Sequence, residues 1–197
     1  MSDRGREREV DADVRALASV LRWRILRLCL DEALTNREIA ARLRRDPGTT
    51  YHHVRTLAER GFLAAQPERR GRRGAREVPY LATRKTWRTD VGPIGHRVLI
   101  ETFLEEVGEA DPATVDIARL GMRLGTDARA ELGRRLSELL QEFADAPPEP
   151  GGVPYSLFIA VHEDAARRPA PAEADAQADA EADAEAGPEA GPEVEPE

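Results

Sequence analysis

Residues 46–63, DPGTTYHHVRTLAERGFL, restrict the fold more than any other stretch, because both ends of a short helix are marked within them. Asp46 can accept hydrogen bonds from the first free backbone N–H groups. Pro47 suits the first helical position, where its missing N–H has no partner to lose. Gly61 stands where a helix exit favours a left-handed residue. The stretch therefore predicts a helix that begins after Asp46 and ends before Gly61.

The two faces of this expected helix differ in chemistry. The inward face consists of residues three and four positions apart: Thr50, His53, Val54, Leu57 and Ala58. The opposite face carries hydrogen-bonding, aromatic and cationic side chains: Thr49, Tyr51, His52 and Arg55. A helix of this width fits a DNA major groove, although a solvated surface helix explains the same pattern equally well. The neighbouring segments decide between these two readings.

The residues before this stretch predict a helix-turn-helix. Thr35 and Glu38 have the spacing of a capping box, in which the two residues satisfy each other's free backbone N–H groups. They open a second short helix that runs through about Arg44 and turns directly into Asp46. The order of helix, turn and helix is the one used by many DNA-binding proteins.

A longer helix is expected earlier, from Asp11 or Asp13 to about Glu32. Its core stripe consists of Val14, Leu17, Ala18, Leu21, Ile25 and Leu28. Trp23 and Leu26 lie off this stripe, so the helix is apolar on a second side. We interpret that second side as the contact with a partner subunit or with the C-terminal part of the chain.

A β-hairpin with a cationic tip is expected after Gly61, with strands at residues 62–66 and 78–82. The tip contains five arginines: Arg69, Arg70, Arg72, Arg73 and Arg76. A solvated loop is the simpler interpretation, but arginines this close together repel one another, which favours a polyanionic partner.

The positive charge of the chain is concentrated in the half that contains the expected helix-turn-helix and hairpin. Residues 1–90 carry 21 Arg and Lys against 13 Asp and Glu, whereas the whole chain of 197 residues has a net charge of −8. The basic half is the electrostatic footprint of a polyanion-binding domain. The acidic surplus therefore lies in residues 91–197.

Several functions find no support in the sequence. The one cysteine, Cys29, excludes an internal disulfide and a multi-cysteine metal site. His52 and His53 are adjacent and point to different helix faces, so they cannot chelate one ion together; His53 is interpreted as a hydrogen-bonded core histidine. No phosphate loop, nucleophile elbow or ligand cluster is present, so we expect no enzyme activity, no metal and no cofactor. Without a long apolar run or a signal peptide, the expected location is the cytoplasm, with no membrane partner.

The C-terminal half is expected to hold a second, smaller module. Residues 84–93 are interpreted as a hinge, followed by an amphipathic helix over 94–107. A strand over 114–124, a helix over 126–144 and a strand over 154–161 complete a strand-helix-strand arrangement. The expected division is a disordered leader at 1–9, a DNA-binding domain at 10–90, a dimerisation or effector module at 91–164, and a disordered acidic tail at 165–197.

With these segments in place, the first 82 residues resemble the winged-helix domain of the ArsR-like family of bacterial transcriptional regulators. The resemblance rests on ALASVLRWRIL at 16–26, TNREIA at 35–40, TTYHHVRTL at 49–57 and GFL at 61–63. It departs from the family at Ser19-Val20, where many members have Asp-Pro, and the cysteine pair of the family's metal sensors is absent. Less closely, residues 94–162 resemble an extension found in some actinobacterial members.

The resemblance implies a fold class of mainly α structure with a small amount of β structure, and a homodimer that binds double-stranded DNA. It implies that Thr49, Tyr51, His52 and Arg55 face the major groove and that the five tip arginines form a wing. We expect a repressor with an inverted-repeat operator, and a second module that either forms a dimer surface or binds an unknown small-molecule effector. The expected dimer residues are Trp23, Leu26, Ile94, Val98 and Phe103. The alternative is a winged helix that binds protein, with the acidic tail as a docking or DNA-mimicking segment.

Overall fold

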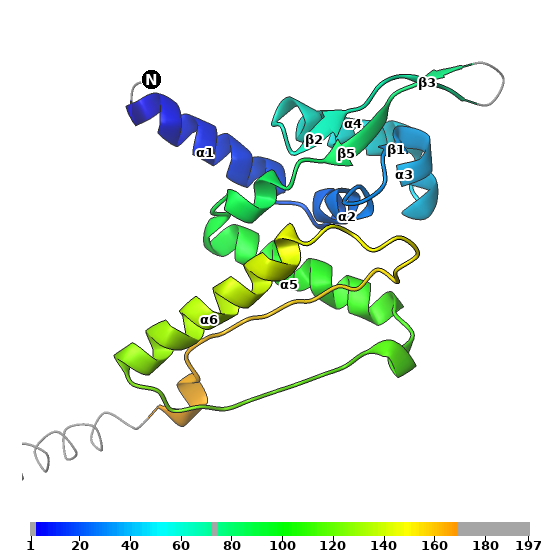
Figure 1. The fold of residues 1–197 in the computed structure, drawn as a ribbon. Coiled ribbons are helices and arrows are strands. Elements are labelled where there is room, and N and C mark those ends of the chain that lie inside the picture. The colour runs from blue at the N-terminus through cyan, green and yellow to red at the C-terminus, as the bar shows by residue number, and fades with distance from the viewer. Residues whose placement is uncertain (1–2, 72–74, 169–197) are drawn as a thin grey trace, which may run out of the picture. The chain divides into compact units, whose positions relative to one another are not determined.

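The computed structural model describes residues 3–71 and 75–168 (Figure 1). Helices dominate, and they are accompanied by a three-stranded antiparallel sheet and a two-stranded hairpin. The expected fold class, mainly α with a small amount of β structure, is confirmed. The chain divides into two compact units: residues up to 118 together with 139–154, and residues 119–138 together with those from 155 onward. The disordered tail was expected over 165–197: Ala165–Arg167 form a 3-10 helix, and residues 169–197 lie outside the described residues.

The single long helix expected before residue 32 is in fact two helices, α1 (Asp3–Leu17) and α2 (Val20–Leu28). The chain breaks at Ser19, which is extended with φ −158° and ψ 121°. Two side chains of α2 satisfy carbonyl groups near the end of α1: the Trp23 Nε1–H donates to Leu17 O at 2.8 Å, and Arg22 donates to Arg15 O at 3.0 Å. These contacts replace the helical hydrogen bonds that the break removes.

Residues 3–9 were expected to be disordered, but they form the first turns of α1. Arg60, far along the chain, donates to Glu9 O at 3.0 Å and to the Asp13 carboxylate at 2.7 Å. Tertiary contacts of this kind stabilise a helix whose charged composition does not by itself predict helical structure.

The helix-turn-helix consists of α3 (Asn36–Arg42) and α4 (Pro47–Glu59). Beside it lies a sheet of β1 (Leu34–Thr35), β5 (Pro79–Ala82) and β2 (Leu63–Ala65), in the order β1-β5-β2. Leu34 pairs with Tyr80, and Ala64 pairs with Leu81. Strands β2 and β5 were expected, whereas β1 is only two residues long and its sequence does not reveal it.

One hydrophobic core joins these elements. Its fully buried side chains come from α1, α2, β1, α3, α4 and the chain after α4: Leu17, Ile25, Cys29, Leu34, Ile39, Val54, Leu57 and Phe62. Burying a side chain of this size stabilises a fold by about 1.5–3 kcal/mol. The core therefore fixes the helix-turn-helix against α2 and the sheet.

Helix α5 (Gly92–Glu109) packs against α2 and belongs to the same unit. Val98 and Leu99 lie against the core, and Arg24 and Arg27 of α2 form ion pairs with α5. The Arg24–Glu109 pair measures 2.6 Å and the Arg27–Glu106 pair 2.9 Å. The second apolar side of α2 is thus covered by α5 of the same chain. A short 3-10 helix, η2 (Lys85–Arg88), precedes α5 where a hinge was expected.

The C-terminal part contains α6 (Thr126–Asp145) and two short 3-10 helices, η3 (Pro112–Thr114) and η4 (Ala165–Arg167). The strands expected at 114–124 and 154–161 are not formed, because neither segment has a ladder partner among the described residues. Ile117 in the first segment is 86% exposed and Tyr155 in the second is 85% exposed, so neither side chain is buried as a strand would require. No helix in the described part of the chain has the length and apolar character needed to cross a membrane.

Candidate nucleic-acid interface

Both ends of α4 are fixed by the residues that the sequence marks. The Asp46 carboxylate accepts from Thr49 N at 2.8 Å, and Pro47 occupies the first helical position. At the other end Gly61 has φ +71°, Phe62 N donates to Leu57 O at 2.9 Å, and Gly61 N donates to Ala58 O at 3.0 Å. These are the two hydrogen bonds of a Schellman motif, and the buried Phe62 and Leu57 make its hydrophobic contact.

The two faces of α4 divide as expected. Thr50, Val54 and Leu57 are buried. The four side chains expected to read DNA are all exposed on the other side: Thr49, Tyr51, His52 and Arg55. The rings of Tyr51 and His52 meet edge to face with centroids 6.2 Å apart. A row of donors, acceptors and aromatic edges thus stands on a helix that is rigidly held from behind.

His53 differs from its expected role as a hydrogen-bonded core residue. It is half-buried, and its Nδ1 is buried without a hydrogen-bond partner among the described residues. Burial, followed by the positive charge of Arg22 and then His52, lowers the pKa of His53 from its ordinary value. Both the burial and the neighbouring cations therefore favour the neutral imidazole over the charged one.

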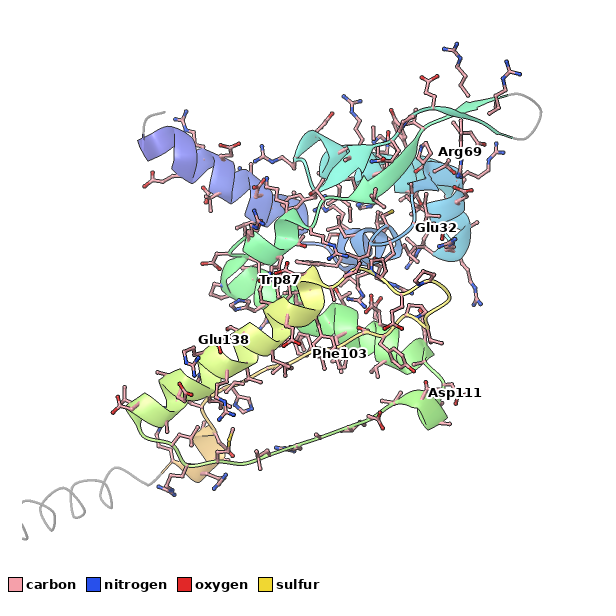
Figure 2. The ribbon with its side chains drawn as sticks, in the orientation of Figure 1. Glu32, Arg69, Trp87, Phe103, Asp111 and Glu138 are labelled. Carbon is pink, nitrogen blue, oxygen red and sulfur yellow. The ribbon has the colours of Figure 1, made fainter. Side chains whose placement is uncertain are left out.

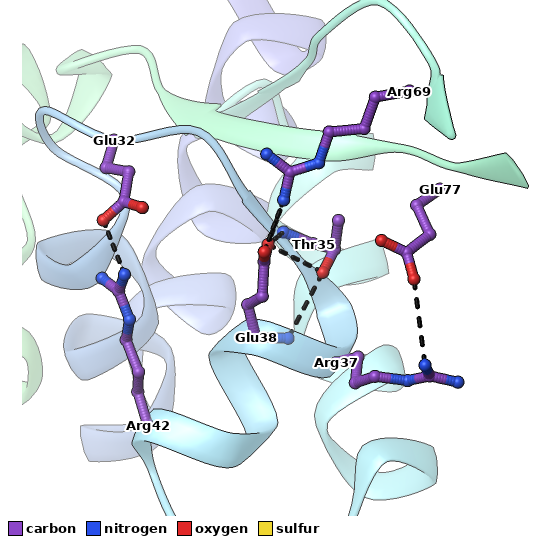
Figure 3. A network of polar contacts seen from close by, with 7 residues as sticks. All are labelled: Glu32, Thr35, Arg37, Glu38, Arg42, Arg69 and Glu77. Atoms are coloured by element: carbon purple, nitrogen blue, oxygen red, sulfur yellow. Dashed lines mark hydrogen bonds and ion pairs between the residues drawn. The ribbon is translucent and has the colours of Figure 1, made fainter. Parts of the chain in front are cut away.

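The wing consists of β3 (Arg69–Arg70) and β4 (Arg76–Glu77), with Arg69 opposite Glu77. Arg69 donates to the Glu38 carboxylate at 2.5 Å, and Arg37 of α3 lies 3.9 Å from Glu77 of β4 (Figure 3). Two ion pairs thereby connect the wing to α3: the wing supplies the cation in one pair and the carboxylate in the other. Arg72 and Arg73 lie outside the described residues.

Glu38 is the central residue of this network (Figure 3). It closes the expected capping box, because its carboxylate accepts from Thr35 N at 2.8 Å while Thr35 Oγ1 accepts from Glu38 N at 3.3 Å. Desolvation opposes ionisation, but the hydrogen bonds from Thr35 and the charge of Arg69 hold the pKa of Glu38 below its ordinary value. Glu38 therefore caps α3 and holds the wing as a carboxylate.

Several cations of the expected interface are paired with carboxylates of the same chain. Arg55 forms an exposed pair with Glu59 at 2.6 Å, and Arg76 lies 3.6 Å from Glu68. Exposed pairs of this kind contribute only about 0.2–1 kcal/mol, so a phosphate or a base edge can replace the carboxylate at small cost.

Three other arginines of the helix-turn-helix and the wing are exposed and form no ion pair within the described part of the chain: Arg44, Arg45 and Arg70. Arg44 and Arg45 occupy the turn between α3 and α4, and Arg44 has φ +52°. The sequence analysis overlooked these two. Two adjacent cations directly before the Asp46 cap are the signal that could have identified them, since phosphates commonly lie against such turns.

The residues expected at a dimer surface fall into two groups. Trp23 and Leu26 are buried in the core of a single chain. On α5, Ile94 is exposed, whereas Val98 and Phe103 are half-buried. Ile100 and Leu104 of the same helix are also exposed. Of the five expected residues, only Ile94 is therefore exposed in a single chain.

The described residues contain no group of three or more His, Cys, Asp or Glu side chains placed to hold a metal ion. Cys29 is fully buried, and burial raises its pKa to about 12. A thiol in this state is a poor metal ligand, because metals bind the thiolate.

Comparison with protein families gives one match: residues 30–67 match the IclR helix-turn-helix domain. The matched segment contains α3, the turn, α4 and β2. No curated protein matches the chain. Residues 30–67 thus contain a helix-turn-helix, and the wing follows them in the chain. This is the class of domain that DNA-binding transcription regulators use.

Several solved structures show distant similarity to this chain. An ArsR-like transcriptional regulator from Rhodococcus sp. RHA1 has 19% identity and a TM-score of 0.37, over 75% of this chain and 100% of its own. Reduced HlyU from Vibrio cholerae N16961 has 19% identity and a TM-score of 0.34, over 51% and 93%. The MepR–DNA complex of S. aureus has 13% identity and a TM-score of 0.29, over 71% and 93%. At these values the similarity does not single out one family.

Proposed function

We propose that this protein is a sequence-specific transcription regulator of the ArsR-like type, which represses genes as a homodimer on an inverted-repeat operator. The observation that carries the proposal is the exposed row Thr49, Tyr51, His52 and Arg55 on a helix capped at both ends. Helix α4 has 13 residues and is about 20 Å long, so it can lie in a major groove about 12 Å wide.

Each part of the interface has a distinct task in this proposal. Arg55 has the planar fork that bonds two acceptors on a guanine edge. Arg44, Arg45 and Arg70 neutralise phosphates on either side of α4, and they fix orientation rather than sequence. The wing arginines Arg69 and Arg76 exchange their carboxylate partners for phosphate when DNA approaches.

The homodimer is supported by the exposed apolar residues of α5: Ile94, Ile100 and Leu104. Large apolar side chains exposed along one helix are typical of an interaction site. Two reading helices related by a two-fold axis enter successive major grooves about 34 Å apart, which predicts an operator of two inverted half-sites. The ArsR-like assignment is supported by the quoted sequence segments.

Selection of bound fragments from the protein's own genome tests this proposal most directly. We expect recovered fragments to share an inverted repeat with half-site centres about one helical turn apart. Sedimentation should give twice the mass of one chain. Recovery of unrelated sequences with equal affinity would contradict sequence-specific recognition, and a protein-binding winged helix would then be the better interpretation.

A further inference from the structure

The turn at residues 84–88 contacts two separate parts of the first unit. It consists of Arg84 and η2 and follows β5 directly. One side of the turn holds the C-terminal end of α4, and the other holds the C-terminal end of α6. Residues 141–145 of α6 belong to the same unit as the turn.

On the α4 side, the contacts converge on one buried carboxylate. Asp13 of α1 is only 6% exposed, and it accepts from Arg60 Nε at 2.7 Å and lies 2.6 Å from Lys85 Nζ. Lys85 Nζ also donates to Arg60 O, the C-cap carbonyl of α4, at 2.9 Å. Because Asp13 is nearly dry and doubly paired, this side of the turn is held firmly.

The choice of lysine at position 85 is specific. The chain has 29 Lys and Arg residues, and Lys85 is the single lysine. Its ammonium satisfies Asp13 and Arg60 O and lies 4.6 Å from the centre of the Phe62 ring. A compact point charge with three donors can serve these three directions at once, whereas a planar guanidinium is too wide.

On the α6 side, the contacts are few and exposed. Trp87 Nε1 donates to Gln141 Oε1 at 2.7 Å, and Trp87 is 53% exposed (Figure 2). The Arg84 guanidinium donates to Ala144 O and lies 3.6 Å from the Asp31 carboxylate. Water can replace exposed hydrogen bonds of this kind at small cost, so this end of α6 can leave the turn readily.

A strained residue, Arg84, lies between the contacts to α4 and the contacts to α6. Arg84 is left-handed, with φ 59° and ψ 15°, a conformation that a residue with a side chain keeps only when its surroundings hold it. Thr83 Oγ1 donates to Gly61 O at 2.7 Å and accepts from Lys85 N at 3.3 Å beside it, and the Arg84 guanidinium adds two contacts, one of them to α6.

We propose that the turn at residues 84–88 couples the docking of α6 to the recognition helix, with Lys85 as a positioning residue for α4. Docked α6 keeps Arg84 in its strained conformation and Lys85 against the end of α4. Release of α6 loosens that end of α4 and weakens DNA binding. The DNA-binding part of this inference rests on the proposed function, whereas the coupling within the chain does not.

Hydrogen exchange on the full chain without DNA tests the coupling. Gln141→Ala removes the acceptor of Trp87, and we expect the amides of residues 57–62 to exchange about fivefold faster, the change expected for one lost hydrogen bond. Glu142→Gln, on the neighbouring position of α6, is the matched control and should leave these amides unchanged. Equal exchange in Gln141→Ala and the control would overturn the proposal.

Two substitutions at residue 84 test the strain. Both Arg84→Ala and Arg84→Gly remove the guanidinium, but only alanine retains the cost of a left-handed backbone. We therefore expect faster exchange at residues 57–62 in Arg84→Ala than in Arg84→Gly. Equal exchange in these two variants would show that strain has no part in the coupling.

Fluorescence anisotropy with a labelled 30-base-pair duplex from the selected fragments tests the consequence for DNA. We expect Gln141→Ala to weaken binding about fivefold with an unchanged salt slope, because no phosphate contact is lost. If wild type and variants all fail to bind, the proposed function fails while the exchange result still decides the coupling. Binding unchanged in Gln141→Ala would overturn the claim that α6 controls DNA affinity.

Discussion

Arg69 of the wing donates to both carboxylate oxygens of Glu38, the residue that closes the capping box of α3. One side chain therefore fixes the start of the helix-turn-helix and the position of the wing. The two contributions can be separated, because a capping box accepts glutamine in place of glutamate whereas an ion pair does not.

Substitution of Glu38 should separate capping from wing attachment. Glu38→Gln keeps the box and should change the free energy of unfolding by less than about 0.5 kcal/mol, whereas Glu38→Ala loses the box and should cost about 1 kcal/mol. Urea unfolding measures both values. Arg69→Ala is the control that breaks the ion pair alone, and a loss as large as that of Glu38→Ala would contradict this division.

Arg55 and Glu59 should act in opposite directions on DNA binding. Arg55→Ala should lose about 1–3 kcal/mol of discrimination between the operator and a variant with a changed guanine. Glu59→Gln releases Arg55 from its 2.6 Å ion pair and should strengthen binding without loss of discrimination. Competition titrations with the two duplexes measure both effects. A uniform loss for all sequences in Arg55→Ala would assign Arg55 to phosphate.

The three unpaired arginines should determine the salt dependence of binding. Replacing Arg44, Arg45 and Arg70 with alanine should weaken binding to every sequence and reduce the slope of log K against log salt by about 0.9 per lost phosphate contact. A variant with the same charge change elsewhere, Arg97→Ala with Arg129→Ala and Arg135→Ala, is the control. An unchanged slope in the first variant would remove these residues from the interface.

His53 should make stability fall on acidification. Its pKa in the folded state is lowered from 6.5, so below that pH the unfolded chain binds more protons than the folded chain. The stabilising contribution of the neutral ring is thus complete above pH 6.5 and is lost as the pH falls through the folded pKa. Thermal unfolding between pH 5 and 7.5 should show a smaller slope in His53→Phe than in wild type, and parallel curves would contradict it.

Cys29 should resist thiol reagents in the native protein. Its side chain is fully buried and its pKa is raised to about 12, so almost no thiolate is present at pH 8. An aromatic disulfide reagent should titrate no thiol in buffer and one thiol per chain in concentrated urea. Rapid reaction in buffer would show that the core around Cys29 opens.

The caps of α3 and α4 could be predicted from the sequence because a cap depends only on residues close to it in the chain. Asp46, Thr35 and Gly61 act on backbone groups within a few residues of themselves, and each is found in its expected role. The break at Ser19 could not be predicted in this way. The apolar stripe continues across it, and the side chains that compensate for it, Arg22 and Trp23, show their role only in the folded chain.

Electrostatic pairing and strand formation depend on distant residues. Glu38 and Arg69 are 31 positions apart, so the sequence shows two charges but not their contact. The nearly continuous apolar run at 154–161 suits a strand, but a strand also requires a neighbouring backbone. Among the described residues that neighbour is missing, and the segment is extended without pairing.

The single lysine among so many arginines gives this protein an intrinsic chemical reporter. Lys85 has the one side-chain amine of the chain that an amine-reactive label can modify, and this amine donates a hydrogen bond to the C-cap carbonyl of α4. The rate at which Lys85 is modified, followed by mass spectrometry, therefore reports how readily the C-terminal end of α4 opens. No engineered probe is needed for this measurement.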